Sequence, residues 1–224
     1  MGNIFRNLDW SVLRNALISI IPVLFCITLH ELAHGYTAYR LGDSTAKDMG
    51  RLTLNPIKHI DVFGVLMLAV FGFGWAKPVP VNMRMFKKPK TYMAITALAG
   101  PVCNILLAAV VFFILGLVYT LFGGDYASGS GSIVLELISR VATLSVALAV
   151  FNLVPIPPLD GSKVLFSLLP ETAYYKLMKY ERFGMIILIL FIWSNYFDDT
   201  VGRVTVAARD WFLGIFHFAL NLVN

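Results

Sequence analysis

Three long apolar runs constrain the fold of this chain more than any other feature of its sequence. They cover about residues 15–39, 92–122 and 133–154. A helix rises about 1.5 Å per residue, so about 20 apolar residues cross the hydrocarbon core of a bilayer. The strands of membrane β-barrels alternate apolar with polar residues, whereas these runs are continuously apolar. The sequence therefore predicts an all-α integral membrane protein that folds as a polytopic helical bundle.

The composition agrees with this class. Charged residues form 14% of the 224-residue chain and hydrophobic residues form 58%, whereas soluble domains contain about 25% charged residues. The net charge of +5 would suggest nucleic acid in a soluble protein. Here we attribute it to basic loops that set membrane orientation, and we expect no nucleic-acid partner. No stretch is polar enough to form an added soluble domain, so we predict a single membrane-embedded domain over residues 1–224.

Two shorter features modify the simple bundle. Residues 62–75 are apolar but too few to span, and residues 51–54 alternate in the manner of a short strand. Together they predict a re-entrant segment or a short β-hairpin element after the first helix. Gly100 and Pro101 interrupt the second apolar run. Because proline favours the first turn of a helix, we predict a lead-in segment to Ala99 and a new span from Pro101.

The loop charges predict the orientation. Residues 77–90 contain five basic residues and no acidic one, residues 161–182 are also mainly basic, and residues 123–132 contain one acid and no base. Cytoplasmic loops carry an excess of Lys and Arg. We therefore expect a multi-pass protein of the cell membrane, with residues 77–90 and 161–182 on the cytoplasmic side.

The first apolar run contains the pattern His30-Glu31-Leu32-Ala33-His34. Histidines four residues apart project from one face of a helix and can bind one metal ion. Glu31 can then reach a water molecule on that ion as a general base. A soluble helix could carry the same residues on a solvated face, but ionisable groups within a membrane helix are costly and usually functional. The pattern predicts a metal site near the cytoplasmic end of this span.

A catalytic zinc ion takes three protein ligands and keeps one open position, so two histidines need a third partner. Asp160 is the preferred candidate because it follows an apolar run, lies behind three prolines that restrict its backbone, and precedes Gly161. It also lies near the cytoplasmic end of its segment, at the depth expected for the histidines. The alternative is that Asp160 is only a turn residue. The candidates compared were His59, His217, Glu136, Glu171, Glu181 and Asp160.

Three segments resemble the signatures of the site-2 protease family of intramembrane zinc metalloproteases. They are His30–His34, Ala99–Asn104 and Phe151–Gly161, in the family's order. The resemblance implies a three-helix metalloprotease core over about residues 15–170, with accessory C-terminal helices over residues 171–224. PDZ and CBS domains are absent from the sequence, which is similar to a compact subgroup of the family.

The resemblance also implies roles for single residues. It implies one Zn²⁺ per chain on His30, His34 and Asp160, and a general acid and base at Glu31. It matches Asn152 and, more weakly, Asn104 to asparagines that act on the substrate or the oxyanion. Alternatively, either amide bonds a neighbouring helix within the bilayer.

The expected activity is hydrolysis of peptide bonds in or near transmembrane helices of membrane-protein substrates, within the lipid bilayer. The alternatives are a catalytically silent adaptor and a metal-binding or transport protein on the same fold. His59 is a possible gating or accessory residue, or else a loop histidine that bonds the backbone. The sequence predicts no oligomeric state.

Overall fold

The computed structural model describes residues 10–64, 67, 75–122, 130–192 and 195–222. Within these residues, all regular elements are helical and none is a β-strand. Three of the described helices are long and apolar enough to cross a membrane, over Ile20–Arg40, Pro89–Thr120 and Ile133–Leu153. The prediction of a helical, multi-pass membrane protein is therefore confirmed.

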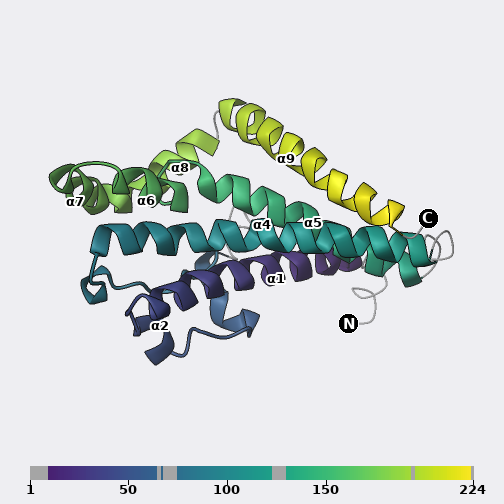
Figure 1. Ribbon diagram of the computed structural model, residues 1–224, viewed down its shortest axis with the longest axis horizontal. Coiled ribbons are helices and arrows are strands. Elements are labelled where there is room, and N and C mark those ends of the chain that lie inside the picture. Colours follow the sequence, from purple (N-terminus) through teal and green to yellow (C-terminus); the bar gives the residue numbers. More distant parts are fainter. Residues whose placement is uncertain (1–9, 65–66, 68–74, 123–129, 193–194, 223–224) are drawn as a thin grey trace, which may run out of the picture.

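These spans belong to helices α1 (Trp10–Arg40), α4 (Pro89–Phe122) and α5 (Ser130–Leu153). The three helices pack against one another, with α4 in contact with both of the others (Figure 1). Fully buried alanines on α4 and α5 allow close approach of the two backbones, as is common where membrane helices pack. The largest buried cluster consists of Ala108, Phe112, Ala142, Val146 and Phe212.

Polar side chains hold the connection between α1 and α4. It contains the short helices α2 (Thr45–Asp48), η1 (Pro56–His59) and η2 (Met83–Met85). Asp43 is fully buried, and its carboxylate accepts hydrogen bonds from Thr45 N at 3.0 Å and Asn82 N at 2.6 Å. A buried carboxylate requires such donors. The connection is thus fastened to the end of α1.

The predicted strand at residues 51–54 is wrong. Thr53 N donates to Arg51 O at 3.0 Å, which bends the chain away from an extended conformation. The buried Arg51 guanidinium donates instead to the carbonyls of Lys77 and Pro78, at 2.9 and 3.2 Å. No β-hairpin occurs in the described part of the chain. Residues 62–64 form a helical turn, and most of the predicted re-entrant segment, 65–66 and 68–74, lies outside the described residues.

The predicted break before Pro101 is also wrong, because α4 continues through it from Pro89 to Phe122. Proline inside a helix removes one backbone hydrogen bond. Pro101 is fully buried among its neighbours, so its helical conformation is held within the packed bundle. The lead-in segment and the span are therefore one helix.

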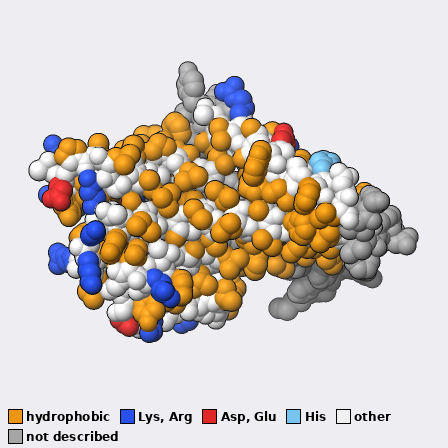
Figure 2. Space-filling model, viewed as in Figure 1, with side chains coloured by type: hydrophobic (Ala, Val, Ile, Leu, Met, Phe, Trp, Pro, Cys, Tyr) orange, Lys and Arg blue, Asp and Glu red, His pale blue; other side chains and the backbone are white. Residues whose placement is uncertain are grey.

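The chain after α5 forms α6 (Asp160–Ser167), α7 (Glu171–Tyr180), η4 (Glu181–Phe183), α8 (Gly184–Ile192) and α9 (Asn195–Asn221). Helix α6 packs on α4, and α9 packs on α4 and α5. In Figure 1, α6 and α7 lie at the left end with α2, whereas α9 runs towards the opposite end. Figure 2 shows Lys and Arg side chains gathered at that left end and hydrophobic side chains over the middle. This distribution is typical of a membrane protein with one basic face.

Candidate metal centre

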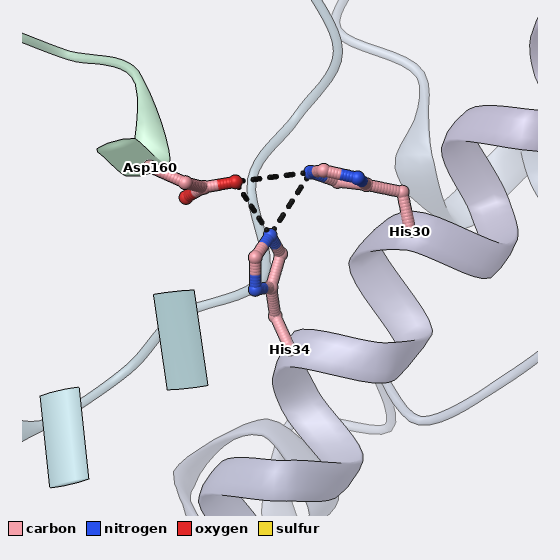
Figure 3. A group of neighbouring side chains, drawn as sticks. All are labelled: His30, His34 and Asp160. Carbon is pink, nitrogen blue, oxygen red and sulfur yellow. Dashed lines mark hydrogen bonds and ion pairs between the residues drawn. The ribbon is translucent and has the colours of Figure 1, made fainter. Parts of the chain in front are cut away.

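His30, His34 and Asp160 meet at one point (Figure 3). The two histidines lie one turn apart on the same face of α1, and Asp160 is the first residue of α6. The Nε2 atoms of the histidines are 3.0 Å apart, and they lie 3.2 and 3.1 Å from Asp160 Oδ2. The structure therefore brings together the three residues that the sequence predicts as metal ligands.

The three side chains are buried, with exposed fractions of 6% for His30, 8% for His34 and 8% for Asp160. Burial by itself raises the pKa of the Asp160 carboxyl group, but the polar contacts of its Oδ2 with the two histidines and the charge of Lys163 hold that pKa below its usual range. The carboxylate is thus kept ionised. Two imidazole nitrogens and one ionised carboxylate are a ligand set typical of catalytic zinc, which also keeps a position open.

The close approach of α4 supports the fit of an ion at this point. A Cβ atom on Gly100 would come within 2.5 Å of His30 Cε1 and closer still to His34 Nε2. Only glycine therefore leaves room for the two imidazole rings beside α4. In the part of the chain that the structure describes, no second cluster of three His, Cys, Asp or Glu residues has this geometry.

The faces of the imidazoles that point away from this centre contact α4. His34 Nδ1 donates a hydrogen bond to Thr96 O at 2.7 Å, and His30 Nδ1 lies 3.1 Å from Asn104 Nδ2. Thr96, Gly100 and Asn104 are spaced by four residues, which places them on neighbouring turns of one helix face. Thr96 is absent from the sequence prediction of the site, and Gly100 appears there only as a helix break and as part of a motif, although this spacing was available as a signal.

Glu31 lies beside the centre rather than in it. Its side chain lines a cavity of about 160 Å³ together with His30, His34 and Asp160. Val79 N donates a hydrogen bond to Glu31 Oε2 at 2.7 Å, which fixes the carboxylate against the chain segment before α4. A second cavity, of about 230 Å³, shares His30 and Glu31 with the first. The carboxylate is thus accessible from the space on both sides.

Asn152 and Lys163 also line the first cavity. Asn152 Nδ2 donates to Leu148 O at 2.9 Å within α5, and the residue lines the second cavity too. Lys163 Nζ lies 3.8 Å from Asp160 Oδ1 and 3.6 Å from Glu181 Oε1. Lys163 is a site residue that the sequence reasoning did not single out. The sequence does place Lys163 three residues after Asp160, a spacing that brings the two side chains together on a helix.

The structure does not bring Asn104 and His59 into this cavity. Asn104 is fully buried behind His30. His59 is 2% exposed, and its Nε2 lies 3.0 Å from Thr53 O. It lines a different, mainly apolar cavity of about 190 Å³ together with Thr28. The other histidine, His217, is exposed on α9.

The comparison with known families shows which family the chain belongs to. A family model described as Peptidase family M50 matches residues 18–130 and 127–194. The chain belongs to peptidase family M50. The matched ranges contain both histidines of α1, Glu31 and Asp160, and the match confirms the resemblance to site-2 proteases that the three motifs indicate.

Relatives of this M50 chain carry names of the same enzyme class. It is 44% identical over 197 residues to "Putative zinc metalloprotease YwhC" of Bacillus subtilis, which covers 88% of this chain and 90% of the relative. It is 33% identical over 163 residues to "Putative zinc metalloprotease MJ0611" of Methanocaldococcus jannaschii, over 72% and 75% of the two chains. It is 29% identical over 201 residues to "Putative zinc metalloprotease Rip2" of Mycolicibacterium smegmatis, over 87% and 70%. No solved structure matches the chain. Family and relatives together support a metalloprotease.

Proposed function

We propose that this M50 protein is an intramembrane zinc metalloendopeptidase that hydrolyses peptide bonds in or near transmembrane helices. The observation that carries the proposal is the convergence of His30, His34 and Asp160 within 3.2 Å beside the carboxylate of Glu31. A binding or transport site needs ligands for the ion, but it does not need a carboxylate held beside them in an open cavity. This favours the enzyme over a silent adaptor or a transporter.

The two histidines and Asp160 would hold one zinc ion per chain. When bound, zinc supplies Lewis-acid activation of a water molecule. The buried, ionised state of Asp160 and the fixed orientation of His34 on Thr96 O are suited to holding such an ion without further rearrangement.

Glu31 would move the proton. Its carboxylate would accept a proton from the attacking water and deliver it to the leaving amine of the cleaved peptide. The hydrogen bond from Val79 N to Glu31 Oε2 would orient this carboxylate, leaving the other oxygen directed to the reaction. Asn152 lines both cavities, and its amide would donate to the developing oxyanion or to the substrate backbone.

The substrate would lie across Glu31 and Asn152 as an extended peptide. The two cavities that share these residues give space on both sides of the reacting bond. A transmembrane helix already uses its backbone hydrogen bonds, so it would unwind locally to expose a carbonyl group. Residues 75–82 have no regular secondary structure at the site, and they would offer the edge against which the unwound peptide binds.

The basic loops support an active site on the cytoplasmic side of a multi-pass membrane protein. We assign the whole chain, 1–224, to one peptidase domain, with a core over about residues 15–170. Residues 171–224 would be accessory, although Glu181 reaches Lys163 beside Asp160.

Metal analysis combined with a cleavage assay tests the proposal. Purified wild type, Glu31→Gln and Asp160→Ala would be reconstituted in vesicles with a panel of tagged single-span membrane proteins. We expect one zinc per chain in wild type and Glu31→Gln, none in Asp160→Ala, and cleavage by wild type alone. Removal of the general base should slow cleavage by about 100-fold or more. Cleavage by Glu31→Gln at the wild-type rate would contradict the mechanism.

A further inference from the structure

Asn104 is fully buried on α4, and one end of its amide group has no partner. Its Nδ2 lies 3.1 Å from His30 Nδ1, whereas its Oδ1 has no hydrogen-bond donor. A buried polar atom without a partner is costly. The unpaired oxygen belongs to the same amide whose nitrogen contacts His30, a candidate metal ligand. The hydrogen bonds that this amide can make therefore depend on the protonation of His30.

The position of the proton on the His30 ring decides whether Oδ1 or Nδ2 of Asn104 can hydrogen-bond to Nδ1 of that ring. A neutral imidazole carries one proton, on Nδ1 or on Nε2. With the proton on Nε2, His30 donates to Asp160 Oδ2, and Nδ1 accepts from the Asn104 amide N–H. This tautomer fits the contacts of the two side chains as they lie.

Metal binding requires the other tautomer. A metal on Nε2 takes the lone pair of that nitrogen, so the proton must be on Nδ1. Nδ1–H then faces an amide N–H, and the two donors repel. A half-turn of the Asn104 amide exchanges Oδ1 with Nδ2 and supplies the acceptor that Nδ1–H needs.

We propose that Asn104 is a positioning residue for the metal site, and that its amide accepts a hydrogen bond from His30 Nδ1–H when metal is bound. The inference rests on the proposed metal centre and adds to it. It replaces the expected role of Asn104 at the substrate or oxyanion with a role behind a metal ligand. The residue is fully buried, so bulk water cannot provide the acceptor in its place.

His34 differs from His30 in the partner of its Nδ1 atom. Its Nδ1 faces the backbone carbonyl of Thr96, which can only accept a hydrogen bond. The proton of His34 is therefore on Nδ1 with or without metal, and Nε2 stays ready to bind. Of the two histidines, only His30 has a partner that can both donate and accept. The readiness of His30 then depends on Asn104.

Zinc affinity tests the role of the acceptor. The dissociation constant of the full-length chain for Zn²⁺ would be measured in detergent by competition with a chelator. Asn104→Leu keeps a similar volume without an acceptor, and we expect 10- to 100-fold weaker binding, the usual range for such partners. Asn104→Asp keeps an acceptor and should bind within a few-fold of wild type. Ser145→Ala is the matched control, since Ser145 is also fully buried but bonds Val141 O on α5.

A second readout separates positioning from packing. The chain has four histidines, so ¹⁵N spectra of labelled histidine can be assigned by substitution. We expect zinc to convert His30 from the Nε2–H to the Nδ1–H tautomer in wild type, with no change of tautomer in His34. A His30 that is already Nδ1–H without metal would contradict the proposed half-turn.

The outcomes distinguish this inference from the proposed function. Wild type that binds no zinc overturns the metal centre itself. Wild type that binds zinc, with Asn104→Leu equally tight, overturns only the role of Asn104. Equal weakening in Asn104→Leu and Asn104→Asp would show a packing role and also overturn it. Far-UV circular dichroism of each variant would verify that the helices are retained.

Discussion

The two halves of α4 use one spacing for two purposes. In the half near the metal centre, Thr96, Gly100 and Asn104 face the histidines of α1. In the other half, residues at the same spacing, Ala108 and Phe112, pack into the apolar cluster with α5 and α9. Four residues of a helix turn through about 400°, so each step shifts the direction by about 40°. The stripe therefore rotates from α1 to α9 along the helix.

Polar contacts to the candidate ligands and apolar packing thus occupy separate turns of one helix. The metal half carries buried polar groups that need partners, and the packing half carries alanine and stacked aromatic rings. Phe112 and Phe212 stack with ring centroids 6.0 Å apart. A substitution in the metal half should change metal binding, whereas one in the packing half should change only stability.

Glycine substitutions give the largest expected contrast. Gly100→Ala would place Cβ against both imidazole rings, so we expect zinc binding to fall by at least about 100-fold, beyond the effect of losing one hydrogen bond. Gly116→Ala would place Cβ 2.6 Å from Phe216 O and 2.7 Å from Ala219 Cβ, in the packing half. It should lower thermal stability but leave zinc per folded chain unchanged. Metal analysis after size-exclusion chromatography would measure both. Zinc retained in Gly100→Ala would contradict the expected difference between the two halves of α4.

Phe112→Ala should affect stability alone. It removes a 3% exposed side chain from the apolar cluster, and large-to-small core changes of this kind cost about 3 kcal/mol. Thermal unfolding in detergent would report the loss, and chelator competition would report zinc affinity. We expect zinc affinity within two-fold of wild type, by the approximate additivity of distant sites. A parallel loss of zinc affinity would mean that the two halves are coupled.

Lys163→Gln should have a smaller effect on the metal centre. Lys163 Nζ is 3.8 Å from Asp160 Oδ1, on the side away from the oxygen that faces the histidines. The pKa of Asp160 lies well below neutral pH, so the carboxylate stays ionised when this charge is removed. Removing a positive charge beside the site lowers the repulsion of Zn²⁺, and we expect zinc affinity to rise by about three- to ten-fold, equivalent to about 1 kcal/mol. Lys163→Arg keeps the charge and serves as the control. The same change in both variants, or a loss of affinity in Lys163→Gln, would exclude this electrostatic effect.

The pair Glu136 and Arg140 on α5 should matter least. The two side chains are 2.8 Å apart at an i, i+4 spacing, and both are more than 40% exposed. Such pairs contribute about 0.3–0.5 kcal/mol. Glu136→Gln should therefore leave zinc affinity unchanged and shift the unfolding midpoint by no more than about 2 °C for a chain of this size. A clear loss of zinc would show that the first turns of α5 influence metal binding at the candidate centre.

The class of fold and the meeting of the three candidate ligands followed from the sequence for physical reasons. Continuous apolar runs leave only helices in a bilayer, and the i, i+4 histidines and the proline-restricted Asp160 had little freedom to lie elsewhere. The structure brings those three side chains together, as the sequence predicts.

Other features were not accessible to that reasoning. Thr96 contributes a backbone carbonyl, which no side-chain pattern records. Arg51 was assigned to a strand because of local alternation, but its guanidinium bonds distant carbonyls that the sequence does not place beside it. The local pattern at Pro101 predicts a helix start, because it does not show the tertiary packing that keeps this proline inside α4.

The distribution of the three ligands along the chain has a consequence for biosynthesis. His30 and His34 enter the membrane with α1, early in translation, whereas Asp160 follows both α4 and α5. A nascent chain therefore holds an incomplete set of candidate ligands until the start of α6 has left the ribosome. Under the proposed function, hydrolytic competence arises only after α1, α4 and α5 have been inserted. Helices α1, α4 and α5 of the same polypeptide thus meet no finished protease during their own insertion.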